Sequence, residues 1–202
     1  MHRTTRRLLP STIIEGAARR FVAALVPLLG GLLLALAMTA PAKADFQYSQ
    51  PVSNLLSSKF CIGIGGGSND SGAKTGLYSC DGRANQQFKF FGNRFDTWIK
   101  ANGTSGMCLR ISGSLNAEGS RDVYQSNLSC GSSQRTRWRL TNSTGGIVHS
   151  TAHYANIRSN AYPSMCIGAG GGQMFHDNVV KAYTCAGDPN QSWHVNSSSN
   201  MP

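Results

Sequence analysis

The stretch CIGAGGGQMFHDNVVKAYTCAGDPNQSWHV, residues 166–195, contains every element of a unit that occurs three times in this chain. Its two cysteines are 19 residues apart, and Trp193 follows the second cysteine by 8 residues. A stretch that begins 105 residues earlier, at Cys61, has the same two spacings and closes with Phe88. Equal spacing of two cysteines and an aromatic residue indicates two copies of one structural unit.

A third, looser copy lies between these two. Cys108 and Cys130 are 22 residues apart, and Trp138 again follows by 8 residues. The segments that lead into the last two copies also match, because Ile99–Asn102 and Ile157–Asn160 stand at the same distance before their first cysteine. Three copies of one unit predict a repeat architecture with pseudo-threefold symmetry.

The first 44 residues have the composition of a secretion signal. Five arginines precede an apolar run over residues 21–38, and Ala42-Lys43-Ala44 has the small-x-small pattern that signal peptidase cleaves. We therefore expect a signal peptide at 1–44, a mature domain at 45–202, and a secreted protein, or a periplasmic one in a Gram-negative host. The alternative is an uncleaved anchor, since the run approaches the length of a membrane span. After cleavage no membrane insertion is expected.

The mature chain is only mildly basic. The whole chain has a net charge of +10, and removal of the leader leaves 13 Lys and Arg against 8 Asp and Glu. Nucleic-acid binding usually requires a concentrated basic stripe. Only Arg135, Arg137 and Arg139 come close, and their alternation is typical of a solvated strand face. We predict no nucleic-acid partner.

An exported chain with an even number of cysteines is expected to form disulfides. Six cysteines allow 15 pairings. Structurally equivalent copies are expected to pair their cysteines in the same way, which favours one disulfide within each copy. The predicted disulfides are Cys61–Cys80, Cys108–Cys130 and Cys166–Cys185. No thiol then remains for catalysis.

Motifs for metals, phosphates or catalysis are weak. No C-x-x-C occurs, and His149 and His153 have a metal-ligand spacing only on a helix, whereas the surrounding sequence is typical of strands. The glycine-rich runs 63–67 and 168–172 lack the Lys-Ser/Thr of a phosphate loop, and their recurrence predicts turns with positive φ. No catalytic triad or carboxylate pair is marked. We predict no metal, no cofactor and no enzymatic activity.

Short runs of strand-forming residues alternate with clusters of Gly, Asn, Ser and Asp. The expected strands include 97–100, 107–111, 138–141, 146–150, 156–159 and 192–195. A copy of about 50 residues is too small to bury its own aromatic residue. Three copies can close into a barrel with Phe88, Trp138 and Trp193 at equivalent inner positions. The predicted fold is all-β, a β-trefoil of three pseudo-symmetric repeats with one disulfide each.

The motifs Asn85-Gln86-Gln87-Phe88 and Asn190-Gln191-Ser192-Trp193 resemble the Q-x-W signature of ricin B-type lectin domains. An aromatic residue two positions before the second cysteine, Tyr78 or Tyr183, belongs to the same pattern. The resemblance implies that a repeat can hold one sugar. The aromatic side chain would stack on the sugar ring, the Asn would bond its hydroxyls, and an Asp two residues after the first cysteine would bind a pair of hydroxyls.

The chain departs from this pattern in all three repeats. Gly63, Arg110 and Gly168 stand where the family has its Asp. Repeat two also has Leu128 at the aromatic position and Arg135-Thr136-Arg137-Trp138 in place of the signature. Substitute carboxylates could come from four nearby residues. These are Asp70, Asp81, Asp177 and Asp188.

The predicted carbohydrate-binding residues lie in repeats one and three. They are Tyr78, Asn85, Gln86, Tyr183, Asn190 and Gln191. A structural alternative exists for two pairs of them: the glutamines can tie the backbone together within a repeat, and the tyrosines can serve only in packing.

These residues predict a secreted, lectin-like protein with weak sugar sites in repeats one and three, whose partners are glycans or glycoproteins. The alternative is a non-catalytic interaction or cell-targeting subunit of a toxin-like complex that has lost sugar binding and contacts a protein. The degenerate ricin-like subunits of cytolethal distending toxins are an example. A trefoil-type protease inhibitor is a further alternative, although the sequence distinguishes no inhibitory loop.

Overall fold

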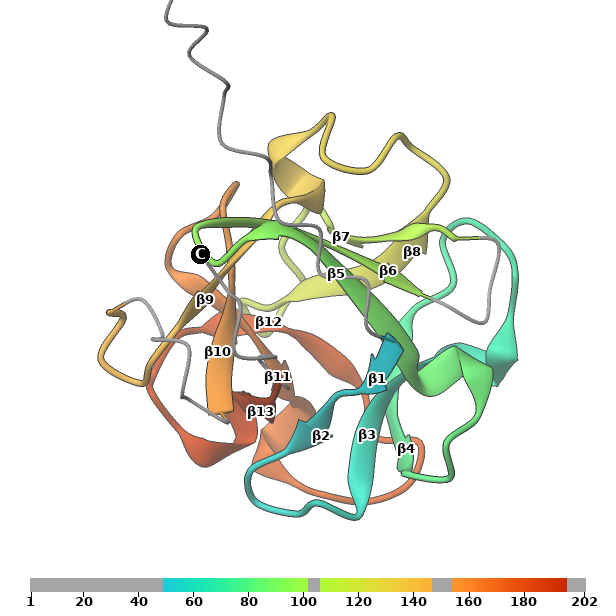
Figure 1. The fold of residues 1–202 in the computed structure, drawn as a ribbon. Coiled ribbons are helices and arrows are strands. Elements are labelled where there is room, and N and C mark those ends of the chain that lie inside the picture. Colours follow the sequence, from blue (N-terminus) through green and yellow to red (C-terminus); the bar gives the residue numbers. More distant parts are fainter. Residues whose placement is uncertain (1–48, 102–105, 147–153, 196–202) are drawn as a thin grey trace, which may run out of the picture. The chain divides into compact units, whose positions relative to one another are not determined.

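The computed structural model describes residues 49–101, 106–146 and 154–195, and the expected signal peptide lies outside these ranges. Within them the chain forms strands and short 3₁₀ turns (Figure 1). The strands are β1 (Ser49–Pro51), β2 (Ser53–Asn54), β3 (Phe60–Ile64), β4 (Thr75–Ser79), β5 (Gln87–Asn93), β6 (Asp96–Ala101), β7 (Cys108–Ile111), β8 (Arg121–Ser126), β9 (Trp138–Thr141), β10 (Tyr154–Ser159), β11 (Met165–Ala169), β12 (Val180–Thr184) and β13 (Ser192–His194). The 3₁₀ turns are η1 (Gly65–Gly67), η2 (Ala84–Gln86), η3 (Gln134–Thr136), η4 (Gly170–Gly172) and η5 (Pro189–Gln191).

Side-chain alternation explains why these segments are strands. Strand β5 reads QFKFFGN, and every second residue of it is buried. Strand β6, DTWIKA, shows the same alternation and pairs with β5 as an antiparallel hairpin. Because successive side chains of a strand point to opposite faces, one face enters the core and the other stays partly exposed.

The strands join into one continuous sheet in the order β1-β5-β6-β7-β8-β12-β11-β10-β13-β2-β3-β4, with β9 pairing both β10 and β6. The three repeats contribute the equivalent hairpins β3–β4, β7–β8 and β11–β12 (Figure 1). Thr75 connects them, because its Oγ1 lies 3.0 Å from the Val123 carbonyl oxygen and 2.9 Å from that of Val180. This arrangement confirms the predicted β-trefoil.

The three signature aromatics occupy equivalent positions in the core. Phe88, Trp138 and Trp193 are 1%, 0% and 0% exposed. The indole N–H of Trp138 donates to the Leu109 carbonyl at 3.2 Å, and that of Trp193 donates to the Ile167 carbonyl at 2.8 Å. Both carbonyls belong to the residue after the first cysteine of the repeat. Repeat one has Phe88 instead and therefore lacks this hydrogen bond.

Each repeat is closed by its own disulfide. The three bonds are Cys61–Cys80, Cys108–Cys130 and Cys166–Cys185, as the repeat symmetry predicts. A disulfide that closes a loop of about 20 residues stabilises a fold by roughly 3 kcal/mol in the chain-entropy model. These bonds therefore compensate for the small core of a single repeat.

The glycine-rich runs form turns, as their recurrence predicts. Gly66 and Gly67 have φ of 61° and 65°, and Gly171 and Gly172 have φ of 60° and 69°. Only glycine adopts this backbone conformation without a steric cost. The two runs are turns between paired strands and not phosphate-binding loops at the start of a helix.

Most of the expected strands appear with bounds shifted by one or two residues. The expected strand at 146–150 falls largely outside the described residues, as do His149 and His153. None of the helices in the described ranges is long and apolar enough to cross a membrane. Among these residues no group of three or more His, Cys, Asp or Glu side chains is arranged to hold a metal ion.

Truncation of the core tryptophan should cost more stability than truncation of the tyrosine two residues before the second cysteine. Trp193→Ala removes a fully buried side chain and its hydrogen bond, which we expect to cost about 3–5 kcal/mol. Tyr183→Ala removes a half-buried one and should cost less. Chemical denaturation of both variants checks this, and equal shifts of the two midpoints would contradict the assignment of inner and outer aromatics.

Candidate functional site

The residues predicted for repeats one and three come together at two separate cavities. Tyr78, Asn85 and Gln86 line a cavity of about 310 Å³ in repeat one. Tyr183, Asn190 and Gln191 line one of about 410 Å³ in repeat three. In each repeat the tyrosine comes from the second strand of the hairpin, and the other two come from the 3₁₀ turn after the second cysteine.

The two glutamines hold the backbone on either side of the disulfide. Gln86 is 2% exposed; its Nε2 donates to the Ser79 carbonyl at 2.8 Å, and its Oε1 accepts from the Asp81 amide at 3.1 Å. These two residues flank Cys80. Gln191 makes the same pair of bonds to Thr184 and Ala186 around Cys185. The geometry thus gives both glutamines a structural role.

The two asparagines are half-buried and each is fixed by one hydrogen bond. Asn85 Nδ2 donates to the Ile64 carbonyl at 3.0 Å, and Asn190 Nδ2 donates to the Ala169 carbonyl at 3.2 Å. The two acceptors occupy equivalent positions, three residues after the first cysteine. Each amide is therefore held in one orientation at the wall of its cavity, which suits a group that must bond hydroxyls with little loss of entropy.

The Tyr78 ring covers the position where the family has its Asp. A Cβ atom added to Gly63 would lie 2.6 Å from Tyr78 Cδ2, and one added to Gly76 would lie 3.1 Å from Tyr78 Oη. Gly63 and Gly76 are directly paired across β3 and β4. The ring thus packs on two facing glycines, and the loss of the Asp side chain is what allows this approach.

In repeat three the tyrosine ring lies farther from the glycine that replaces the family's Asp. A Cβ atom added to Gly168 would be 3.4 Å from Tyr183 Cδ2 and 3.0 Å from Gln191 Cγ. The residue paired with Gly168 is Lys181 and not a second glycine. The Tyr183 ring therefore lies at van der Waals distance from the space where an Asp side chain would start.

Both tyrosine hydroxyls stay protonated at neutral pH and can donate a hydrogen bond. Burial raises the pKa of Tyr78, and the charge of Asp177 raises it further against the effect of a hydrogen bond from the Gly66 backbone. Burial also raises the pKa of Tyr183; the positive charge of Lys181 opposes this shift, and the negative charge of Glu118 adds to it.

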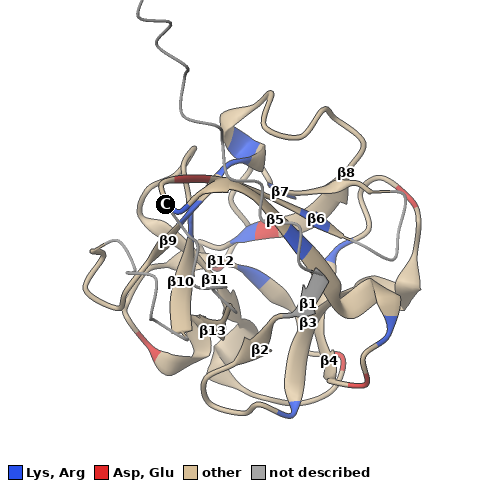
Figure 2. Cartoon of the chain, viewed as in Figure 1, with Lys and Arg blue, Asp and Glu red and all other residues tan. Residues whose placement is uncertain are grey.

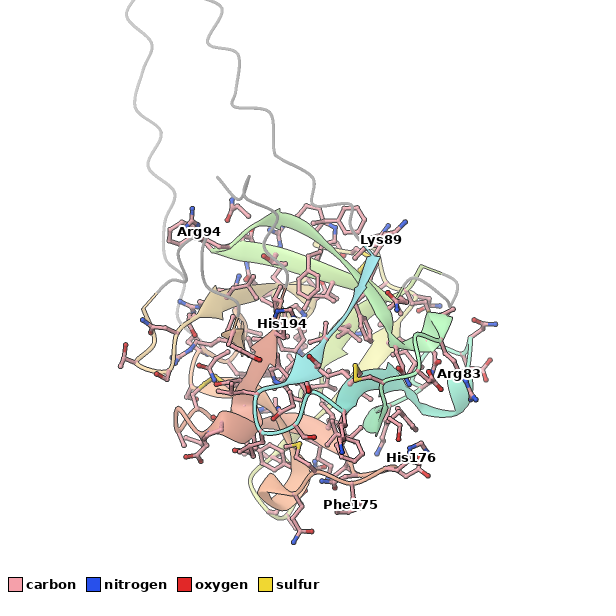
Figure 3. The ribbon with its side chains drawn as sticks, turned by 60° about the horizontal axis from the view of Figure 1, so that its bottom comes forward. Arg83, Lys89, Arg94, Phe175, His176 and His194 are labelled. Atoms are coloured by element: carbon pink, nitrogen blue, oxygen red, sulfur yellow. A yellow bond between two sulfur atoms is a disulfide. The ribbon has the colours of Figure 1, made fainter. Side chains whose placement is uncertain are left out.

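Each cavity is completed by a loop from another repeat. In repeat one this is His176, which lines the cavity and meets the Tyr78 ring edge-on, with ring centroids 5.4 Å apart. The Ser79 amide donates to His176 Nδ1 at 3.3 Å. Figure 3 shows His176 on the same side of the molecule as Arg83, another residue of this cavity.

In repeat three the residue contributed by another repeat is Glu118, from the loop between β7 and β8 of repeat two. Its Oε1 accepts from Lys181 Nζ at 2.6 Å and from Ser120 Oγ at 2.8 Å. Hydrogen bonding to Lys181 is the main reason why the pKa of Glu118 is lowered to about 2. The same contact raises the pKa of Lys181.

Of the four proposed substitute carboxylates, the structure places two at the cavities and two away from them. Asp81 lines the cavity of repeat one, where Arg83 Nε pairs with it at 2.9 Å, and Asp188 lines the cavity of repeat three. Asp70 and Asp177 line neither of the two cavities. Sequence reasoning missed Glu118, because the cysteine spacing relates positions within a repeat and not between repeats.

A sequence signal for Glu118 does exist. The loops between the two hairpin strands carry an acidic residue at nearly the same distance from the first cysteine in every repeat. These residues are Asp70, Glu118 and Asp177. The loops of repeats two and three each reach the next repeat around the axis, since Glu118 contacts Lys181 and His176 contacts Tyr78. The loop of repeat one does the same, because Ser71 Oγ bonds Asn127 Oδ1 at 3.2 Å.

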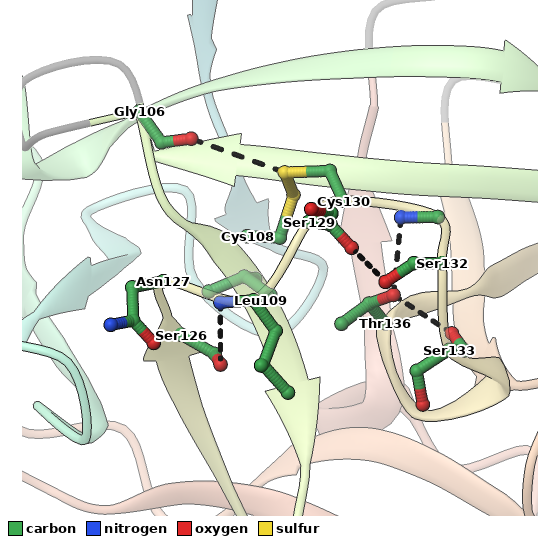
Figure 4. The surroundings of a disulfide bond; sticks show 12 residues. Gly106, Cys108, Leu109, Ser126, Asn127, Ser129, Cys130, Ser132, Ser133 and Thr136 are labelled. Carbon is green, nitrogen blue, oxygen red and sulfur yellow. Dashed lines mark hydrogen bonds between the residues drawn. A yellow bond between two sulfur atoms is a disulfide. The ribbon is translucent and has the colours of Figure 1, made fainter.

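In repeat two the Arg135 guanidinium lies over the glycine that is equivalent to Gly66 and Gly171. Arg135 occupies the position of Asn85 and Asn190, and a Cβ added to Gly113 would lie 2.6 Å from its Nη1. Thr136 replaces the glutamine with a shorter connection, in which Oγ1 accepts from the Gly131 amide and donates to the Ser133 carbonyl (Figure 4). The site of repeat two is therefore closed while its fold is kept.

Another cavity in repeat two lies elsewhere, beside the disulfide. It measures about 490 Å³ and is lined by Trp98, Lys100 and Leu128 among others. The Leu128 side chain is 44% exposed and offers no flat ring for stacking. The Arg137 guanidinium lies 5.9 Å from the Trp98 ring and forms an ion pair with Asp96.

Basic residues do not gather into a stripe on the described part of the fold. Figure 2 shows Lys and Arg dispersed over several strands and loops. Two of the three arginines that alternate around β9 have different local contacts, since Arg135 covers Gly113 and Arg137 pairs with Asp96. The surface therefore does not suggest a track for a nucleic-acid backbone.

The family model of the ricin-type beta-trefoil lectin domain matches residues 49–155. The chain belongs to this family. The match ends where the third repeat begins, and the fold supplies that repeat with equivalent strands, disulfide and signature tryptophan. No curated protein sequence matches the chain at a significant level.

Solved structures of similar fold include lectins and a designed protein. The designed threefold-symmetric protein ThreeFoil is 21% identical, with a TM-score of 0.60, over 74% of this chain and 97% of that one. The ricin B-like lectin of Macrolepiota procera, solved with lactose, is 14% identical, with a TM-score of 0.58, over 77% of this chain and 99% of that one. By contrast, the chain spans only 17% of a mosquitocidal holotoxin, at 14% identity, 75% coverage of this chain and a TM-score of 0.61. At these identities the likeness establishes the fold.

Restoring the family's Asp should be harder in repeat one than in repeat three. Gly63→Asp forces the Tyr78 ring away from the two glycines. We expect the free energy of unfolding to fall by about 1–3 kcal/mol, as at other overpacked sites. Gly168→Asp meets less resistance and should cost less. Denaturation midpoints of both variants test this, with Gly63→Ala and Gly168→Ala separating the effect of Cβ from that of the charge. An equal loss in the two repeats would refute the packing difference.

Proposed function

We propose that this protein is a secreted carbohydrate-binding protein that holds sugars in repeats one and three and catalyses no reaction on them. The observation that carries the proposal is the difference between repeats. Repeats one and three each keep a cavity with a tyrosine and an oriented asparagine, whereas Arg135 closes the same place in repeat two. Membership of the lectin family supports the ligand class.

The chemistry of the two cavities suits a sugar. Sugar hydroxyls are well hydrated, so a shallow site gains affinity only if an aromatic ring takes the apolar sugar face out of water and fixed polar groups replace the lost hydration. Tyr78 with Asn85, and Tyr183 with Asn190, provide these two elements. The buried glutamines act indirectly in this proposal, since they fix the turn on which each asparagine stands.

Each single site should bind weakly. A carboxylate that accepts two hydroxyl bonds is a strong element of such sites, and neither Gly63 nor Gly168 supplies one. We expect dissociation constants on the order of 1 mM, which correspond to about −4 kcal/mol. Engagement of two repeats by one polysaccharide or cell surface would raise avidity by about 10² or more. Glycans and glycoproteins are the proposed partners.

Export is part of the same proposal. Residues 1–44 have the pattern of a cleaved signal, and disulfides persist in oxidising compartments such as the periplasm or the extracellular space. All three pairs of cysteines form disulfides, and no free cysteine remains. Detection of the mature chain with Asp45 at its N-terminus in the culture medium or periplasm would support this location.

A second candidate function is a non-catalytic interaction subunit that binds a protein. The packing of Tyr78 onto Gly63 and Gly76 favours it, because that ring buries part of its surface against its own strands. A ring packed in this way has a fixed position on the surface even without a bound sugar, and it could equally contact a protein. The two candidates differ in one observable, since only the first predicts binding that free sugar competes away.

Retention on a multivalent glycan surface separates the two candidates. Tyr78→Ala or Tyr183→Ala alone should nearly abolish retention, because either change leaves a single weak site and removes the avidity term. Leu128→Ala is the matched control; it truncates the corresponding residue of the closed repeat and should alter retention only as far as it alters stability. Circular dichroism and melting curves confirm that the variants fold. Unaltered retention by the folded Tyr78→Ala, Tyr183→Ala double variant would exclude these sites and favour the protein partner.

A further inference from the structure

We propose that repeat three is a composite site in which Glu118, donated by repeat two, supplies the carboxylate that repeat three has lost, and that this site selects neutral sugars over acidic ones. The inference rests on the proposed function and assigns to repeat three a binding residue and a ligand class. It begins from the position of Glu118, which lines the same cavity as Tyr183 and Asn190.

The carboxylate of Glu118 is held in place before any ligand arrives. Lys181 Nζ and Ser120 Oγ both bond its Oε1, at 2.6 and 2.8 Å. Lys181 is itself anchored in β12 opposite Gly168, the residue that replaces the family's Asp. A carboxylate fixed by two partners loses little entropy when it accepts a further hydrogen bond.

The carboxylate also retains capacity for a ligand. An ionised carboxyl group offers about four lone-pair sites on two oxygens, and the two side-chain donors use only Oε1. The Glu118 side chain is 49% exposed, so a ligand in the cavity can reach it. Together, Glu118, Asn190 and Tyr183 surround the cavity with an acceptor, an amide and a ring.

The charge around the cavity predicts which sugars fit. Among the described residues, the lining of the cavity includes Glu118 and Asp188 and no Lys or Arg. The nearby Lys181 ammonium is already paired with Glu118 and lies 4.0 Å from Asp122. A sugar with its own carboxylate would face Glu118 and Asp188 with only the Lys181 ammonium to offset their charge, whereas a neutral pyranose with adjacent hydroxyls can donate to Glu118. In the cavity of repeat one, Arg83 pairs with Asp81 and His176 lies beside them, so the described lining has no excess of acidic groups.

Asp188 is the rival source of a carboxylate. It lies in the same cavity, immediately before η5, but its side chain makes no capping bond to that turn. It is exposed, and none of the described residues bonds its carboxylate. An acid without such bonds must be ordered by the ligand, so we assign the larger contribution to Glu118.

The test measures binding separately in each repeat by amide NMR of the mature protein. The reporters are the backbone amides of Gly171 and Thr184 for repeat three and of Gly66 and Gly67 for repeat one. The probes are methyl β-D-galactopyranoside, methyl β-D-glucopyranoside, lactose and glucuronic acid. For the wild type, at least one neutral probe should shift the repeat-three amides, and glucuronic acid should shift them less.

Glu118→Gln should weaken binding of that neutral probe to repeat three by about tenfold, the lower end of what a hydrogen bond to a charged group contributes. It should weaken glucuronic acid less or strengthen it, because the repulsion is removed. Repeat one should keep its affinity. Asp70→Asn is the control; it neutralises the acidic residue of the equivalent loop that faces the closed repeat two and should change neither site.

The following results would overturn the inference. Affinity of Glu118→Gln within twofold of wild type would do so, as would an equal loss for neutral and acidic probes, which indicates a structural role. A loss confined to Asp188→Asn would transfer the assignment to that residue. If sugars shift only repeat one, the composite site is wrong while sugar binding stands; if they shift neither repeat, the proposed function fails as well.

Discussion

No repeat of this protein can bury its signature aromatic residue alone, and the rest of the structure depends on that constraint. Phe88, Trp138 and Trp193 meet in one core that forms only when three hairpins close around the axis. Burial of each large side chain contributes several kcal/mol, and each contribution requires the other two repeats. The closed sheet follows from this shared burial, and the cavities follow from the sheet, because their walls come from strands and turns fixed by it.

The fold was predictable from spacing because the determinants of the fold repeat. Two cysteines and an aromatic at constant distances specify where a hairpin starts, where its loop is closed and which side chain enters the core. The local part of the candidate site was predictable for the same reason: Asn85 and Gln86 follow Cys80 as Asn190 and Gln191 follow Cys185. The sequence leaves two alternatives for the glutamines, sugar binding or a structural role, and their hydrogen bonds to the backbone favour the structural role.

The remaining part of the site could not be predicted because it depends on contacts between repeats. Whether a loop reaches the preceding or the following repeat is decided by the direction in which the hairpins turn around the axis, and no spacing encodes that direction. Glu118 and His176 are therefore absent from any motif of the repeat that they complete. Arg135 is a different case, because its contact with Gly113 lies within repeat two and its replacement of the signature Asn is visible in the sequence.

Sharing of loops around the ring has an evolutionary consequence. Repeat two has Arg135 in place of the signature Asn, yet its loop carries the Glu118 that stands in the cavity of repeat three. If the composite site binds a sugar as proposed, repeat two would remain under selection through the site of its neighbour even though Arg135 stands in its own. A mutation that the motif of one repeat would tolerate is then constrained by the site in the neighbouring repeat. The three copies would therefore diverge as a coupled set and not as independent modules.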